Sequence, residues 1–150
     1  MREDDEPIVV EQTYNTPIDV VWRAITEIDQ MRQWYFENIP SFEPVVGFET
    51  QFDVQFEDRH FLHMWKITEV EPLKMIAYDW RYEGYPGDSF VMFELFQQED
   101  VTKLRLTHQT TKSFPKDIPE FERESGVEGW TFFIQKSLKE FVERNKSSSA

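Results

Sequence analysis

The sequence predicts an α+β domain: strand, two short helices, a run of antiparallel strands and a long C-terminal helix. Two observations predict it. The middle of the chain alternates apolar and polar residues between tight turns, and the C-terminal segment carries apolar residues at helical spacing. At 150 residues the chain has the length of one domain, so we predict a single domain over 1–150 with a core of about 8–144. The acidic N-terminal residues and the tail, 147–150, are expected to be disordered.

The N-terminal part predicts one strand followed by two short helices. Residues 8–14 are strand formers, and Thr16 is placed to cap the helix that follows, with Asp19 completing a capping box. Asp29 is placed to begin the second short helix, and Pro40 prevents further helix beyond it.

The middle of the chain predicts consecutive strands. Phe52, Val54 and Phe56 alternate with polar residues, which is typical of a strand with one buried face. Short turns between the following strands favour an antiparallel meander. These strands are expected over residues 59–70, 75–82, 89–98 and 101–110.

A long amphipathic helix is predicted at the C-terminus. Ser125 and Glu128 form a second capping box. The apolar residues after it follow one another at spacings of three and four, as on one face of a helix: Trp130, Phe133, Ile134, Leu138 and Phe141.

Four motifs occur in a fixed order along the chain. They are Thr16-Pro17-Ile18-Asp19-Val20-Val21-Trp22-Arg23-Ala24-Ile25-Thr26 with the later pair Trp34-Tyr35, Glu69-Val70-Glu71-Pro72 before a strand that reaches Trp80, Thr102-Lys103-Leu104-Arg105-Leu106-Thr107-His108, and Gly129-Trp130. Together they resemble the START-like, or SRPBCC, superfamily. Within it they are most similar to the group named for the activator of the heat-shock protein 90 ATPase.

This resemblance implies a helix-grip fold: a curved antiparallel sheet of about seven strands, wrapped around the C-terminal helix, with two short helices after the first strand. It also implies an apolar cavity between sheet and helix. The family has no shared catalytic set, so the resemblance supplies no catalytic residue and no cofactor.

The composition limits the classes of partner. The net charge of −13, without a basic cluster, excludes the phosphate contacts that nucleic-acid binding requires. No apolar run is long enough to span a bilayer, and the first residues do not read as a signal peptide. The absence of cysteine fits a reducing compartment, so we predict a cytoplasmic protein that binds neither membrane nor nucleic acid.

The leading functional prediction is non-catalytic binding of a small apolar molecule, lipid-like or aromatic, in that cavity. Aromatic walls with a few polar points are typical of such sites, although ordinary core packing explains the same residues equally well. The expected ligand-binding residues are Trp34, Phe52, Phe56, Trp65, Trp80, His108, Trp130 and Phe133.

The histidines allow several roles. His60 and His63 are three apart in a strand and therefore point to opposite faces, which disfavours a shared metal ion. His108 lies on the same face as Leu104 and Leu106, toward the expected cavity. It could be a hydrogen-bonded core residue, orient a ligand, or act as a general acid or base.

Two rival functions remain open. The family name suggests a chaperone-interacting module in a stress response, which would need a docking surface that a fold does not supply. The wider superfamily suggests a cyclase or aromatase that uses His108 with a carboxylate such as Asp79, although Asp79 and Glu94 could equally face water. No nucleophile elbow, dinucleotide motif or phosphate loop supports other chemistry.

The strand around 89–98 is apolar on both faces. Val91, Phe93 and Leu95 occupy one face, while Phe90 and Phe96 lie on the other. Because exposed apolar patches mark interfaces, we predict that a second copy in a homodimer, or a loop of the same chain, covers the outer face.

Overall fold

The computed structural model describes residues 1–56 and 58–148, without the side chains of residues 56 and 145–148. The predicted α+β architecture is confirmed, with strand bounds close to the expected ones. In chain order the elements are β1 (Ile8–Tyr14), α1 (Ile18–Thr26), α2 (Ile28–Trp34), β2 (Glu49–Phe56), β3 (Arg59–Glu71), β4 (Met75–Tyr82), β5 (Asp88–Gln98), β6 (Val101–Lys112), the 3-10 helix η1 (Pro119–Phe121), α3 (Arg123–Thr131), the π-helix η2 (Phe132–Ser137) and α4 (Leu138–Ser148).

One antiparallel sheet of six strands forms the fold, in the order β1-β6-β5-β4-β3-β2. The number of about seven that the family resemblance implies was too high, since six strands form the sheet in the described residues. Strand β1 forms one edge of the sheet. It pairs with β6, so that Ile8 lies opposite His108. The order of the other strands follows the chain, as a meander requires.

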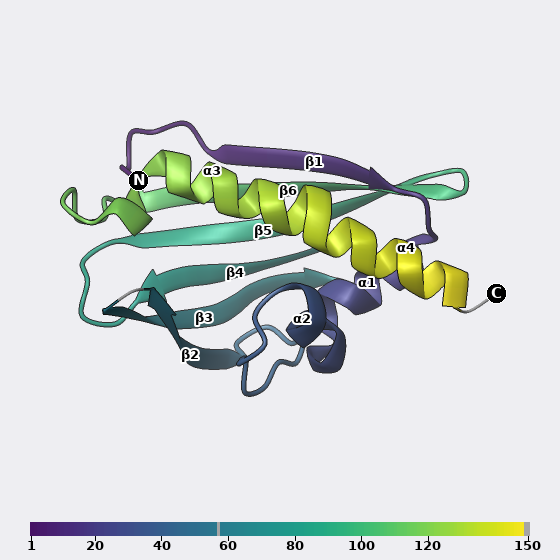
Figure 1. Cartoon of the computed structure of the whole chain (residues 1–150), viewed down its shortest axis with the longest axis horizontal. Coiled ribbons are helices and arrows are strands. Elements are labelled where there is room, and N and C mark those ends of the chain that lie inside the picture. The colour runs from purple at the N-terminus through teal and green to yellow at the C-terminus, as the bar shows by residue number, and fades with distance from the viewer. Residues whose placement is uncertain (57, 149–150) are drawn as a thin grey trace.

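The C-terminal helical run α3-η2-α4 crosses the concave face of the sheet (Figure 1). Alternation along the strands directs one set of side chains toward this run. Val91, Phe93 and Leu95 of β5 are buried there, as predicted. The helical run contributes Trp130 and Ile134 to the same core.

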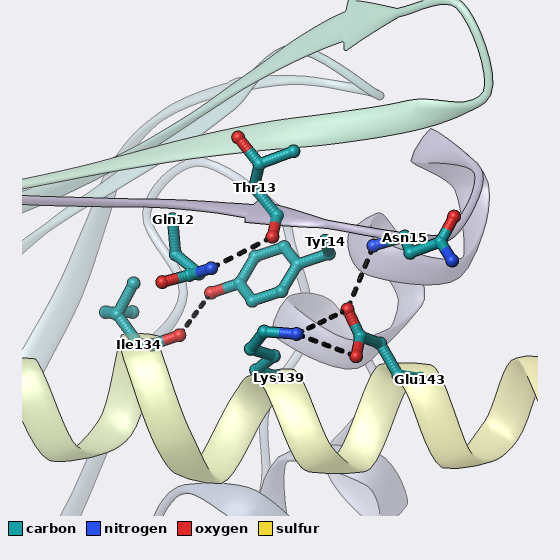
Figure 2. A network of polar contacts seen from close by, with 7 residues as sticks. All are labelled: Gln12, Thr13, Tyr14, Asn15, Ile134, Lys139 and Glu143. Atoms are coloured by element: carbon teal, nitrogen blue, oxygen red, sulfur yellow. Dashed lines mark hydrogen bonds and ion pairs between the residues drawn. The ribbon is translucent and has the colours of Figure 1, made fainter.

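A π-turn interrupts the C-terminal helix where it passes β1. The wider turn of η2 leaves carbonyl groups without their usual helical partners. The Tyr14 hydroxyl of β1 donates a hydrogen bond of 2.6 Å to the Ile134 carbonyl oxygen, as Figure 2 shows. Nearby, the Glu143 carboxylate accepts hydrogen bonds from the Asn15 backbone N–H and the Lys139 ammonium group. Strand β1 therefore fixes both the π-turn and the helix after it.

All three predicted helix caps were wrong. Helix α2 begins at Ile28 with Glu27 at its N-cap position, so Asp29 lies within its first turn. Helix α1 begins after Pro17, and the Thr16 hydroxyl is buried without a hydrogen-bond partner. The Thr16 carbonyl oxygen instead accepts a hydrogen bond of 2.9 Å from the Thr102 hydroxyl, which ties the turn to the sheet. Helix α3 begins at Arg123, so Ser125 lies within its first turn and donates to the Pro119 carbonyl oxygen.

The segments expected to be disordered lie at the two termini. Met1, in the segment expected to be disordered, is buried, and its ammonium group donates to the Phe121 carbonyl oxygen. A hydrogen bond from the Phe114 N–H to the Met1 carbonyl oxygen adds to this contact. Of the expected C-terminal tail, 147–150, the last two residues lie outside the described part of the chain.

Candidate ligand-binding site

A continuous cluster of aromatic rings fills the space between β2–β4, α2 and η2. Trp65 of β3 lies at its centre, with its ring centroid 4.8 Å from that of Phe52 and 5.2 Å from that of Trp80. Tyr35, just after α2, stacks on Trp65 at 5.4 Å and on Trp34 at 4.6 Å. Edge-to-face and offset contacts of this kind are the preferred arrangements of aromatic rings.

Seven of the eight residues predicted to bind a ligand lie in or beside this cluster. They are Trp34, Phe52, Trp65, Trp80, His108, Trp130 and Phe133. The side chain of the eighth, Phe56, lies outside the described part of the structure. Their rings contact one another in the space that was expected to be an open cavity.

His108 is held in a chain of hydrogen bonds. The Trp130 indole N–H donates to His108 Nδ1 at 2.9 Å, so the ring proton is on Nε2, which donates to the Ser89 hydroxyl at 2.9 Å. The Ser89 hydroxyl donates to the Trp80 carbonyl oxygen at 2.6 Å. Burial lowers the pKa of His108 to about 3, so the ring is neutral at physiological pH. Both ring nitrogens are occupied, as in a hydrogen-bonded core histidine.

His63 is buried in a different way. Its Nδ1 lies 3.0 Å from the Phe61 carbonyl oxygen and must donate, since a carbonyl only accepts. Burial lowers the pKa of His63 to about 4, so Nε2 keeps a lone pair. The ring stacks on Phe52 at 5.1 Å and lies 5.4 Å from both Phe36 and Trp80.

A cleft of about 560 Å³ opens beside the aromatic cluster, at the junction of α2, β2 and η2. Phe36, Val54 and Phe133 give it an apolar floor, and Phe132 stands at its rim with 52% of its surface exposed. This volume is within the range of small-molecule sites. The side chain of Asn38 and the guanidinium of Arg32 hydrogen-bond to nearby backbone carbonyl groups and hold the loop after α2 in place.

Phe36 separates the cleft from the interior. Its ring is partly exposed in the cleft, yet its centroid lies 5.3 Å from that of Phe133 and 6.0 Å from that of Trp65. It also contacts Phe52 and His63. A rotation of this one side chain would connect the cleft to the inner face of β2 and β3.

A second depression, of about 530 Å³, lies on the outer face of the sheet. Charged residues of β2 to β4 line it, including Lys66, Asp79 and Arg81, so it suits an apolar ligand poorly. Burial, with the neighbouring Asp88 charge, raises the pKa of Asp79. Because Asp79 is on the outer face and His108 on the inner one, the catalytic pairing of these residues considered from the sequence is wrong.

The expected geometry of the other histidines is confirmed. His60 is exposed and contacts the Asp53 carboxylate at 2.8 Å, whereas His63 is buried on the opposite face of β3. Within the described residues no group of three or more metal-ligating side chains comes together. In the same part of the chain, no helix has the length and apolar character needed to cross a membrane.

Comparison with known families matches residues 15–143 to the family described as activator of Hsp90 ATPase homolog 1-like protein. The match covers most of the chain, from α1 through strands β2–β6 to the first part of α4, and leaves out strand β1. The chain belongs to this family. No curated protein sequence matches it.

Solved structures share the fold of this Hsp90-activator-like chain. A protein from Mesorhizobium loti is 25% identical, with a TM-score of 0.73 over 93% of this chain and 98% of its own. The Aha1 dimer of Colwellia psychrerythraea is 22% identical, with a TM-score of 0.70 over 93% and 97%. An HSP90 activator from Plasmodium falciparum is 18% identical, with a TM-score of 0.72 over 93% and 97%. At these identities the likeness establishes the helix-grip fold.

Sequence reasoning missed three residues of the site. Tyr35 and Phe36 follow α2, where no periodicity predicts which rings turn inward. His63 was weighed only as a metal ligand, although its alternation with Phe61 and Trp65 indicated the inner face of β3.

Proposed function

We propose that this domain is a non-catalytic binding module for a small, neutral, apolar molecule, lipid-like or aromatic. The ligand enters through the cleft at Phe36 and Phe133 and packs against the aromatic cluster between the sheet and the C-terminal helix. The cytoplasm is the compartment we propose for it, from the absence of cysteine.

The cleft carries this proposal. Its apolar floor includes the partly exposed ring of Phe36. This ring contacts Phe52 and Trp65, which are buried on the inner face of the sheet. Rotation of the Phe36 side chain into the cleft would make room for a ligand ring of similar size. The net charge of −13 favours a neutral ligand over an anionic one. His108, with both nitrogens occupied, supports binding over acid–base chemistry.

Thermal-shift titration tests the proposal with two neutral probes, diphenylmethane and 1-decanol. A ligand that binds only the folded state raises the melting temperature. We expect at least one probe to do so, and we expect Phe132→Ser at the rim of the cleft to weaken the shift. Val9→Ser is the matched control, since Val9 is 54% exposed on β1, away from the cleft. If neither probe shifts the melting temperature, the proposal fails.

Family membership favours a second candidate, a module that interacts with the Hsp90 chaperone in a stress response. Its support is the family description and the fold shared with the Plasmodium falciparum HSP90 activator. Stimulation of Hsp90 ATPase activity by the purified domain would favour this role. An unchanged ATPase rate, together with no retention of Hsp90 by the immobilised domain, would exclude it.

We also propose that the outer face of β5 forms a homodimer contact. Phe90, Met92 and Phe96 lie there, and the Phe96 ring is exposed, with the Arg105 guanidinium 5.0 Å from its centroid. The solved structure of Aha1 from Colwellia psychrerythraea, which has the same fold, is a dimer. Light scattering should give a dimer that Phe96→Glu dissociates. A monomer at micromolar concentration would contradict this.

A further inference from the structure

Two buried polar atoms on neighbouring positions of β2 and β3 have no hydrogen-bond partners. They are Thr50 Oγ1 and Trp65 Nε1, and their residues are 9% and 2% exposed. Thr50 and Trp65 are paired in the strand register, so their Cβ atoms are about 5 Å apart on the inner face. An unmet buried donor costs about 1–3 kcal/mol, so two together at one position call for an explanation.

A third polar atom lies on the same face of β3. His63 is two residues before Trp65, and its Nδ1–H is used by the Phe61 carbonyl oxygen. His63 Nε2 keeps its lone pair and accepts no hydrogen bond among the described residues, although it does not belong to the fully buried atoms without a partner. Residues two apart in a strand are separated by about 7 Å. The inner face of β3 thus carries the Trp65 indole donor and the His63 imidazole acceptor on residues whose Cα atoms are about 7 Å apart.

Equivalent groups elsewhere in the cluster are paired. The Trp80 indole N–H donates to the Tyr82 hydroxyl at 2.8 Å, and the Trp130 N–H to His108. Trp34 donates to the Ala24 carbonyl oxygen at 2.7 Å. Besides the Thr16 hydroxyl, which lies outside the aromatic cluster, the unmet buried atoms of the described residues are on β2 and β3. The Phe36 ring contacts His63 and Trp65 on this part of the sheet.

We propose that Trp65 Nε1, Thr50 Oγ1 and His63 Nε2 are the polar anchors of the binding site. They select a flat neutral ligand that carries an acceptor oxygen for Trp65 and Thr50 and a hydroxyl or N–H donor for His63. The ligand reaches them when Phe36 turns into the cleft. This inference rests on the proposed function and adds the chemical class of the ligand.

A matched series of probes tests this class. 4-Hydroxybenzophenone has both groups, benzophenone only the acceptor, 4-benzylphenol only the donor, and diphenylmethane neither. We expect affinity to rise from diphenylmethane through the two single-group probes to 4-hydroxybenzophenone. Each hydrogen bond should contribute about three- to tenfold, as measured by calorimetry or by tryptophan fluorescence.

Two ring-conserving variants assign the anchors. Trp65→Phe should abolish the advantage of the carbonyl group, so that 4-hydroxybenzophenone binds no better than 4-benzylphenol. His63→Phe should abolish the advantage of the hydroxyl group and leave that of the carbonyl. Trp80→Phe is the matched control: it removes the same volume from a neighbouring buried ring whose N–H is paired, and both advantages should persist. Thr50→Val, which keeps its shape, should reduce the carbonyl advantage alone.

The outcomes separate this inference from the proposed function. If all four probes bind equally, or if Trp65→Phe and His63→Phe lower all affinities by one factor, the cleft binds apolar ligands and the anchors are wrong. If the variants change stability but no affinity ratio, the three atoms hold only buried water, and the inference fails. If no probe binds, both proposals fail.

Discussion

The two halves of the inner face differ in whether their buried polar atoms have hydrogen-bond partners. On β4–β6, His108 is bonded on both nitrogens, to Trp130 and to Ser89. On β2–β3, Trp65 and Thr50 have no partner at all. Fully satisfied networks rigidify a core, whereas unmet groups weaken it. We propose from this difference that the β4–β6 half serves stability and that the β2–β3 half, next to the cleft, serves binding.

Removal of His108 should give the largest effect on stability. His108→Leu leaves the Trp130 indole N–H and the Ser89 hydroxyl with one partner fewer, both in the dry core. We expect the free energy of unfolding to fall by about 4 kcal/mol in urea denaturation. His60→Leu, at an exposed position, should change it by less than about 0.5 kcal/mol. Similar losses of unfolding free energy in both variants would contradict a structural role of the hydrogen bonds of His108.

Acidification should weaken the fold through both buried histidines. Burial lowers their pKa values to about 3 for His108 and about 4 for His63, against 6.5 in an unfolded chain. Below pH 6.5 the unfolded chain binds protons that the folded one does not, so stability falls as pH falls. Between pH 6.5 and 5 we expect a loss of about 3 kcal/mol from the two rings.

The same titration separates the two rings. His63→Phe should remove about half of this pH dependence, because the substituted ring cannot bind a proton. Urea denaturation at a series of pH values measures this. A stability that stays constant from pH 7 to 5 is incompatible with two buried neutral histidines.

The π-turn gives a smaller effect. Tyr14→Phe leaves the Ile134 carbonyl oxygen without its donor, while the ring still fills the same space (Figure 2). We expect a loss of about 1 kcal/mol in stability. Because Phe133 follows the geometry of η2, we also expect weaker binding of diphenylmethane in the thermal-shift titration. Unchanged stability would show that the hydrogen bond contributes nothing to holding the turn.

Two buried threonines allow a direct comparison of a bonded and an unbonded hydroxyl, with small expected effects on stability. Thr102 donates to the Thr16 carbonyl oxygen, whereas the Thr50 hydroxyl is unmet. Thr102→Val should therefore lose about 1 kcal/mol in stability, while Thr50→Val should gain a similar amount in the absence of ligand. Thermal or urea unfolding of the two variants measures the difference. A loss of equal size in both would show that Thr50 has a partner after all.

The fold was predictable because its signals are local. Alternation within 75–82 gives β4 to the residue, and helical spacing from Trp130 onward gives the C-terminal helix. The cap predicted at Thr16 failed at a position that a distant contact fixes. The Thr16 carbonyl oxygen accepts a hydrogen bond from the Thr102 hydroxyl, 86 residues away in sequence. Local patterns carry no information about such pairs.

The site was predictable only in part, for the same reason. Aromatic content and strand faces bring Trp65, Trp80 and Trp130 together, but ring packing decides whether space remains between them. The Trp80 indole pairs with Tyr82 on its own strand, but the Trp130 indole pairs with His108, which is distant in sequence, so local patterns do not predict which indole has a partner. The contrast between Trp65 and Trp130 therefore emerges only in three dimensions.

Nuclear magnetic resonance of the five tryptophan indole N–H groups tests the difference between the halves most directly. On titration with 4-hydroxybenzophenone, the Trp65 indole proton should move downfield as it gains an acceptor, while the Trp130 proton, already bonded to His108, should stay in place. Diphenylmethane should leave both protons without a downfield shift. A Trp65 signal that does not move at saturation, or a Trp130 signal that moves more, would contradict a binding site on the β2–β3 half.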